Sequence, residues 1–215
     1  MSLRVQRPLR EGKLLLFVLD LLRETVRVNQ ANYPAQWQRI ARTRDGIDYC
    51  IRPIRIEDAE RDRAFIIHLS EASRYKRLMG SLREPSKELI DRFVRIDYQH
   101  DMAFVAVVDQ LGEERIIGVA RYGATPDKTD AEFAVAVADE WQSRGVGMTL
   151  LRLLFEYAKG QGFRRLHGII FASNDRMLDL ARKLQLQVRS VPDDPTVLEA
   201  ARDLQSESAL DTPAI

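Results

Sequence analysis

One stretch of the sequence limits the possible folds more than any other: a β-rich run at 132–137, a bend with two glycines, and a helical pattern from about 145 to 159. Gly145 and Gly147 lie two positions apart in the bend, and Gly160 ends the helical pattern. Glycines at a strand–helix junction allow a sharp turn and a close approach of ligand to backbone, while the unpaired N–H groups of the first helical turn point outward. The sequence therefore predicts a strand, a bend and a helix in which the bend can bind a phosphate.

Further β-rich and helical patterns surround this unit. Strands are expected at 49–55, 102–108, 116–122 and 166–171, and helices at 57–69, 85–96 and 175–184. The short connections between the runs from 102 to 137 favour an antiparallel meander, and no clear pattern follows Leu184. This order of elements predicts a mixed α/β domain built on a mixed sheet.

We expect one domain at 33–204, preceded by an N-terminal helical extension at 1–32 and followed by a C-terminal tail at 205–215. Apolar residues recur with a helical period over 12–30, which predicts an amphipathic helix. The apolar face of that helix must pack on the main domain or on a second copy of the chain. A homodimer through the N-terminal helix is therefore one hypothesis, and packing within the chain is the alternative.

Neither a membrane span nor a secretion signal is expected. The longest apolar runs, 14–19 and 133–138, have six residues each, whereas a spanning helix needs roughly 20. Asp20 and the charged pair Arg23-Glu24 interrupt the run that most resembles a signal core. Since Cys50 is the single cysteine, the chain can form no internal disulfide, and a cytoplasmic location is expected.

Charge and motif content exclude several functional classes. The 33 Lys and Arg residues balance 32 Asp and Glu, so no net field attracts nucleic acid or an anionic membrane. One cysteine and three scattered histidines offer no metal-ligand spacing, so no metal site is expected. The bend lacks the third glycine of a dinucleotide-binding fingerprint and the Gly-Lys-Ser/Thr of a Walker loop. We expect its phosphate to belong to another kind of ligand.

The pattern Gln142-x-x-Gly145-x-Gly147 resembles the acyl-CoA pyrophosphate loop of the GNAT superfamily of N-acetyltransferases. The resemblance extends over about 33–204 and is strongest to the acetyltransferase domain of bacterial Pat-type protein lysine acetyltransferases, through the segments 51–55, 73–75, 96–98, 118–122 and 173–177. It implies the GNAT fold, acetyl-CoA as co-substrate, and an acceptor protein such as an acyl-CoA synthetase. The synthetase-like or cyclic-nucleotide-binding modules often fused to this domain do not fit in residues 1–32.

The resemblance also implies cofactor-binding residues. Backbone groups of Val135 and Val137 would pair with the pantetheine arm, and both valines can serve the core as well. The segment 142–147 would hold the pyrophosphate, chiefly through backbone N–H groups and with the side chains of Gln142 and Arg144 as helpers; its members are Gln142, Ser143, Arg144, Gly145, Val146 and Gly147. The alternative for the glycines is an ordinary tight turn. Asn174 either contacts the cofactor or simply caps the helix that follows.

Glu132 is the candidate general base. A lysine with a pKa of about 10.4 must lose a proton before it can attack a thioester. Resemblance to Pat-type enzymes puts their catalytic glutamate at Glu132, and burial among apolar neighbours would raise its pKa toward the working range. The alternative is a solvated strand-edge carboxylate. His100 and His167 are further candidate bases, although a lone histidine at a strand margin is more often a surface residue.

Two departures from the family pattern affect the expectations. Many members have a tyrosine general acid where this chain has Ala181, so we expect no such acid; a thiol with a pKa near 8.5 leaves without much help. The family usually has Gly-Phe at the end of the helix expected at 175–184, where this chain has Gln185-Leu186. Arg74 and Tyr75 either line the acceptor side or tie the helices to the sheet, and the structural role is favoured.

Together these features predict an acetyl-CoA-dependent N-acetyltransferase that uses direct attack by an amine, with a protein lysine as the expected acceptor. The same chemistry on a small amine or a protein N-terminus is one alternative. A catalytically silent acyl-CoA-binding sensor is another, because a fold does not by itself decide function.

Overall fold

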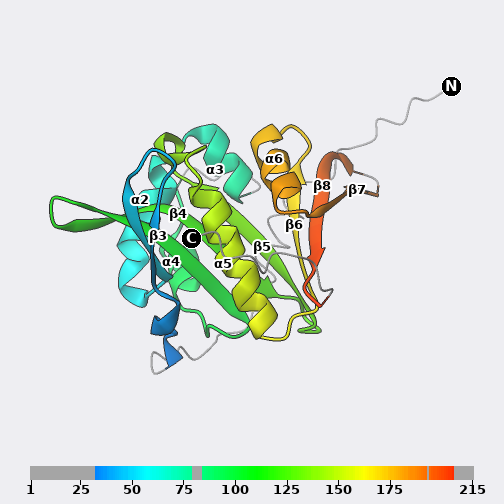
Figure 1. Ribbon diagram of the computed structural model, residues 1–215, viewed down its shortest axis with the longest axis horizontal. Coiled ribbons are helices and arrows are strands. Elements are labelled where there is room, and N and C mark those ends of the chain that lie inside the picture. The colour runs from blue at the N-terminus through cyan, green and yellow to red at the C-terminus, as the bar shows by residue number, and fades with distance from the viewer. Residues whose placement is uncertain (1–31, 79–83, 193, 206–215) are drawn as a thin grey trace.

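The computed structural model describes residues 32–78, 84–192 and 194–205 (Figure 1). The helix expected at 12–30, the dimer contact based on it and nearly all of the tail expected at 205–215 lie outside these residues. Within the described part, no helix is long and apolar enough to cross a membrane.

In the described part of the chain, eight strands form a single sheet. In chain order they are β1 (Arg39–Arg42), β2 (Asp48–Pro53), β3 (Asp101–Gln110), β4 (Glu113–Ala124), β5 (Asp130–Val137), β6 (Arg165–Phe171), β7 (Gln187–Val191) and β8 (Asp194–Asp203). Their order in the sheet is β1-β2-β3-β4-β5-β6-β8-β7. Every neighbouring pair is antiparallel except β5 and β6, which are parallel because α5 connects them as a crossover.

Among the described residues, five α-helices cover this sheet: α2 (Ala59–His68), α3 (Glu71–Leu78), α4 (Lys87–Val94), α5 (Val146–Gly160) and α6 (Asp175–Lys183). Helix α5 runs across one face and packs on β3, β4 and β5 (Figure 1). Helix α4 lies on the other face of the sheet. Gly118 of β4 faces α5, so Arg121, three positions further along the strand, points to the opposite face, where its guanidinium lies over the ring of Phe93 in α4. The largest buried apolar side chains come from both faces; they include Ile51, Ile54, Ile66, Met102, Phe104, Leu150, Leu154 and Leu166.

The expected fold class, a mixed α/β domain on a mixed sheet, is confirmed. The meander β3–β4–β5, the crossover helix α5 and strand β6 occur where the pattern predicts them. Three strands and one helix were not expected, namely β1, β7, β8 and α3. Strands β1 and β7 lie at the two edges of the sheet and are mostly exposed. Their sequences therefore lack the alternation of apolar and polar residues that indicates a half-buried strand.

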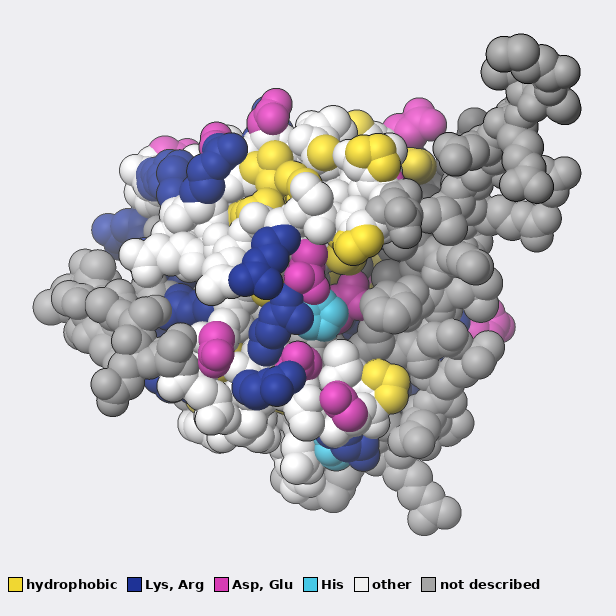
Figure 2. Space-filling view, turned by 90° about the vertical axis from the view of Figure 1, so that its right-hand side faces the viewer, with side chains coloured by type: hydrophobic (Ala, Val, Ile, Leu, Met, Phe, Trp, Pro, Cys, Tyr) yellow, Lys and Arg dark blue, Asp and Glu magenta, His cyan; other side chains and the backbone are white. Residues whose placement is uncertain are grey.

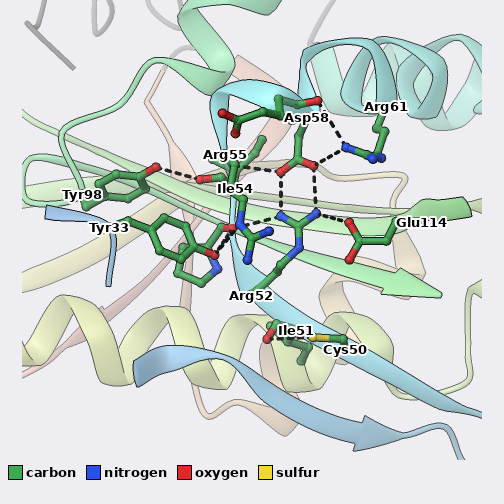
Figure 3. A network of polar contacts seen from close by, with 12 residues as sticks. Tyr33, Cys50, Ile51, Arg52, Ile54, Arg55, Asp58, Arg61, Tyr98 and Glu114 are labelled. Atoms are coloured by element: carbon green, nitrogen blue, oxygen red, sulfur yellow. Dashed lines mark hydrogen bonds and ion pairs between the residues drawn. The ribbon is translucent and has the colours of Figure 1, made fainter. Parts of the chain in front are cut away.

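A buried ion pair joins β2 to the start of α2 (Figure 3). The guanidinium of Arg52 donates to both carboxylate oxygens of Asp58, at 2.7 and 2.8 Å, and a further bond of 2.7 Å reaches Glu114 at the start of β4. Burial alone would raise the pKa of Asp58, but the hydrogen bonds from Arg52 and from the Arg55 backbone hold it below its ordinary value. The alternating pattern of β2 gave no indication that Arg52 points into the protein.

Basic and acidic side chains are intermixed on the face at the β7 and β8 edge of the molecule (Figure 2). One ion pair between β6 and β8 joins Arg165 to Glu199, at 2.7 Å. The described part of this face therefore carries charges of both signs (Figure 2).

Candidate active site

Strands β5 and β6 separate partway along their length. The parallel register of β5 and β6 covers only three residue pairs and ends at Glu132 and His167. Just beyond it, Gly168 lets the strands approach closely, because a Cβ at that position would lie 2.7 Å from the carbonyl oxygen of Phe133. From Phe133 onward, the edge of β5 that faces β6 has no strand partner in the described chain.

A cavity of about 680 Å³ occupies the space between the separated strands. Its walls come from β5 and the end of β6, from the bend before α5, from the α2–α3 junction and from the start of α6. This volume is in the range of small-molecule sites. The cavity brings together most of the residues predicted from sequence: Glu132, Val135, Val137, Gln142, Ser143, Gly145, Gly147 and Asn174.

The bend before α5 has the backbone shape of an anion-binding site. Ser143 has φ of 63° and Gly145 has φ of 98°, a left-handed conformation that glycine adopts without strain. Gly145 is the N-cap of α5, and no side chain caps the helix there. The N–H groups of the first turn, at the positive end of a 15-residue helix, are therefore left for a ligand or for water.

A network of side chains holds the bend in place. The Gln142 side-chain amide donates to the Val137 carbonyl at 3.1 Å and accepts a hydrogen bond from Arg176 of α6. Asp139 accepts bonds of 2.9 and 2.7 Å from the hydroxyls of Ser70 and Ser73 at the start of α3. The polar atoms of Gln142 are thus occupied in ordering the walls of the cavity.

Glu132 lies where the cavity begins between the strands. One of its carboxylate oxygens is buried and has no hydrogen-bond partner among the described residues. Burial raises the pKa of Glu132 from its ordinary value near 4.5 to about 7. A carboxyl group with this pKa can accept a proton near neutral pH, so it is not the solvated strand-edge carboxylate of the alternative interpretation.

Asp101 is a second carboxylate at the same level of the sheet. Asp101 of β3 lies opposite Gly123 of β4, and Gly123 in turn lies opposite Glu132 of β5. The two acids are therefore separated only by a residue that has no side chain. Burial, and then the nearby Asp97, raise the pKa of Asp101 to about 6. Its carboxylate accepts no hydrogen bond from the part of the chain that the structure describes. Sequence reasoning missed Asp101, because only the pairing of three strands brings it near Glu132.

Several other residues have roles that the structure now defines. Asn174 caps α6, since its side chain accepts from the Met177 N–H at 3.4 Å, and it also lines the cavity. Arg74 donates to the carbonyls of Ile67 and Leu69 at the end of α2, so it joins α3 to α2. Tyr75 instead stacks on Phe171 of β6, with ring centroids 5.3 Å apart, and joins the two sides of the strand separation.

Other predicted residues do not face the cavity. Val146, the first residue of α5, is buried against the sheet, and the Arg144 guanidinium turns away to pair with Asp45. The backbone of both residues nevertheless belongs to the bend. His100 pairs with Asp97 and does not line the cavity. His167 does not line it either, and with its side chain 14% exposed it is not the surface residue that was expected. Burial lowers its pKa.

Comparison with known proteins agrees with this geometry. The model of the acetyltransferase (GNAT) family matches residues 63–185. An acetyltransferase of Pseudomonas aeruginosa is 42% identical over 152 residues, which make up 71% of this chain and 82% of that protein. Acetyltransferase Pat of Mycolicibacterium smegmatis is 28% identical over 142 residues, 66% of this chain and 42% of that protein.

Among solved structures, the GNAT domain of S. lividans PAT matches with a TM-score of 0.72 and 27% identity, over 80% of this chain and 99% of that one. The sequence match, the strand separation and the bend before α5 lead to one assignment: the chain belongs to the GNAT family of acetyltransferases.

Proposed function

We propose that this protein transfers an acetyl group from acetyl-CoA to an amine, a protein lysine side chain, with Glu132 as the general base. The observation that carries the proposal is the Glu132 carboxyl group, whose oxygen is buried without a partner where β5 and β6 separate. Its pKa of about 7 suits a group that must take up and release a proton at neutral pH.

The bend and the free edge of β5 suit the two ends of the co-substrate. The N–H groups at 144–147 would bind the diphosphate, helped by the positive end of α5. The backbone of Val135 and Val137 would pair with the pantetheine arm, since that edge of β5 has no strand partner in the described chain. Asn174 lines the same cavity and would contact the arm as well as cap α6.

The reaction follows from these positions. Glu132, directly or through a water molecule, takes a proton from the acceptor ammonium, and the neutral nitrogen attacks the thioester carbonyl carbon. A C–N bond forms, the C–S bond breaks, and the second amine proton can neutralise the leaving thiolate. Ala181 is fully buried and cannot act as a general acid, but a thiol with a pKa of about 8.5 leaves without one.

A cationic acceptor fits the acidic end of the cavity. Asp101 and Glu132 both face it, and among the described residues neither carboxylate is fully hydrogen-bonded. An ammonium group that arrives between them would be stabilised before Glu132 removes its proton. The resemblance of the sequence to Pat-type protein lysine acetyltransferases supports a lysine on a protein, such as an acyl-CoA synthetase, as the acceptor.

The test compares Glu132→Gln with the wild type in thiol release from acetyl-CoA, with an acyl-CoA synthetase as acceptor. We expect turnover to fall by about 100-fold or more while the Kd for CoA stays nearly constant. Asp130→Asn is the matched control: Asp130 lies on the same strand, but it pairs with Arg164 and does not line the cavity. Full activity of Glu132→Gln would remove Glu132 from the mechanism, and CoA binding without turnover on any amine would indicate a sensor.

A further inference from the structure

The hairpin that joins β1 and β2 is docked against the bend before α5. The backbone N–H of Arg44 donates to the carbonyl of Arg144 at 3.0 Å. In return, the Arg144 guanidinium donates to the Asp45 carboxylate at 2.9 Å. This hairpin lies outside residues 63–185, the region that the family model matches. The bend is therefore hydrogen-bonded to a hairpin that lies outside the region matched by the family model.

The side chain of Arg44 lies over Gly145. Its Cγ and Nε are 3.8 and 4.0 Å from the point that a Cβ on Gly145 would occupy, and Arg44 lines the cavity together with Gly145 and Gly147. The docking bonds above fix the backbone of Arg44, so the guanidinium is held near the N-terminus of α5.

Arg44 differs from the other arginines of β1, β2 and the hairpin. Arg39 pairs with Glu156, Arg42 with Asp48 and Arg52 with Asp58. In the described chain, the Arg44 guanidinium makes no hydrogen bond or ion pair, although Asp45 is its neighbour and is already paired with Arg144. An arginine that lines a cavity and has no carboxylate partner has its five N–H donors available to bind an anionic ligand.

We propose that Arg44 binds a phosphate of the acyl-CoA, so that the hairpin and the bend together form the phosphate site. This inference rests on the proposed use of acetyl-CoA. A guanidinium matches the oxygens of a phosphate in a bidentate manner, and the positive end of α5 adds to its attraction. CoA carries phosphate both in its diphosphate and on its ribose, and either one supplies this chemistry.

The experiment measures kcat/KM for three acetyl donors with wild type, Arg44→Gln and Arg42→Gln. Acetyl-CoA carries both kinds of phosphate, acetyl-dephospho-CoA carries only the diphosphate, and acetyl-pantetheine carries neither. Arg42 is the matched control, because it lies on the same hairpin with the same charge but pairs with Asp48 at an exposed position. The thermal midpoint of each variant verifies folding, which Arg44→Gln should not disturb.

We expect Arg44→Gln to lower kcat/KM for acetyl-CoA by roughly tenfold or more through KM, and to leave acetyl-pantetheine nearly unchanged. A loss that persists with acetyl-dephospho-CoA assigns Arg44 to the diphosphate, and a loss confined to acetyl-CoA assigns it to the ribose phosphate; both support the proposal. Wild-type kinetics of Arg44→Gln with acetyl-CoA, or an equal loss with acetyl-pantetheine or in Arg42→Gln, would overturn it. If wild type itself neither binds CoA nor transfers acetyl, the proposed function has failed, which is a different result.

Discussion

Glu132 and His167 form the last residue pair of the parallel register between β5 and β6. The proposed base therefore lies at the position where the two strands begin to separate, with paired sheet on one side and the cavity on the other. Its neighbour His167 is also buried and has a lowered pKa, so it supplies no charge that would keep the carboxylate ionised. Burial therefore raises the pKa of Glu132 to about 7 with no opposing charge from this neighbour.

The first prediction concerns the pH dependence of catalysis. Because Glu132 acts as a base only when it is ionised and its pKa is about 7, kcat/KM for the acceptor should rise with pH through an apparent pKa near 7. Initial rates of thiol release between about pH 5.5 and 8.5 measure this profile. Glu132→Gln should lack the step at pH 7 in whatever activity remains. A step of unchanged position in that variant would assign it to another group.

The second prediction concerns the stability of the fold. The folded-state pKa of Glu132 is about 7, above its ordinary value near 4.5, so the folded state binds the proton more tightly than the unfolded chain. Stability should therefore fall as pH rises from about 4.5 to 7. Glu132→Gln removes this penalty, so it should gain stability relative to wild type at pH 8 by up to roughly 3 kcal/mol, and gain little at pH 4.5. Urea unfolding at both pH values tests this, and an equal effect at the two values would contradict it.

The continuous parts of the site could be predicted from the sequence, because they lie in one segment. Glu132, the free edge of β5 and the bend with Gly145 and Gly147 follow one another within sixteen residues, and strand, bend and helix each have a local pattern. Asp101 and Arg44 could not be predicted, because β-pairing and a docked hairpin bring them to the cavity from distant parts of the chain.

The missed elements share a different cause. Strand β7 is almost entirely exposed and so shows no apolar alternation, and α3 is short and mainly charged and polar, so it has few apolar residues to indicate a buried helix. Strand β8 was overlooked because its buried positions alternate only in part. No strand was therefore predicted after residue 185, because the sequence there has no clear amphipathic pattern, although the chain does form β7 and β8.

The third prediction tests the bend. Gly147 lies in the first turn of α5, and a Cβ there would make ordinary contacts of 3.4 Å with Val137 and 3.6 Å with Leu180. Gly147→Ala should therefore fold normally, with a thermal midpoint equal to or above that of wild type, because alanine favours a helix. The added methyl group projects into the cavity and should weaken CoA binding by about tenfold or more, as measured by calorimetry.

Gly160→Ala is the control for that measurement. Gly160 is the last residue of the same helix, and a Cβ there would have open space around it. The substitution makes the same chemical change in α5 without approaching the cavity, so CoA affinity should remain at the wild-type value. If Gly147→Ala also bound CoA normally, the bend would not be the phosphate site.

The fourth prediction concerns the buried ion pair. Asp58→Ala leaves the guanidinium of Arg52, which is 1% exposed, with Glu114 as its remaining acidic partner, and should destabilise the fold by roughly 3 kcal/mol. Because the pKa of Asp58 is lowered in the folded state, the stabilisation is present at neutral pH and is lost as pH falls through the folded pKa. Urea unfolding at pH 7 measures the difference. The exposed pair of Arg42 and Asp48 is the comparison, and Asp48→Ala should lower stability far less than Asp58→Ala, because water screens a surface ion pair.

The fifth prediction concerns the end of α6, where the family usually has glycine. Gln185 adopts φ of 57°, the N–H of Leu186 donates to the Ala181 carbonyl at 2.9 Å, and the N–H of Gln185 donates to the Arg182 carbonyl at 2.9 Å. These two bonds form a Schellman motif, whose left-handed residue is strained unless it is glycine. Gln185 is exposed and loses no packing when it is replaced, so Gln185→Gly should stabilise the protein by roughly 0.5–1 kcal/mol.

Gln187→Gly is the matched control for that gain. Gln187 is equally exposed but lies in β7 with an extended backbone, so the same substitution adds unfolded-state freedom without relieving strain. It should destabilise the protein by roughly 0.5–1 kcal/mol, opposite in sign to Gln185→Gly. Thermal unfolding of both variants beside wild type decides the matter. A loss of stability in both would show that the left-handed turn after α6 is not strained, and that the departure from glycine costs this chain nothing.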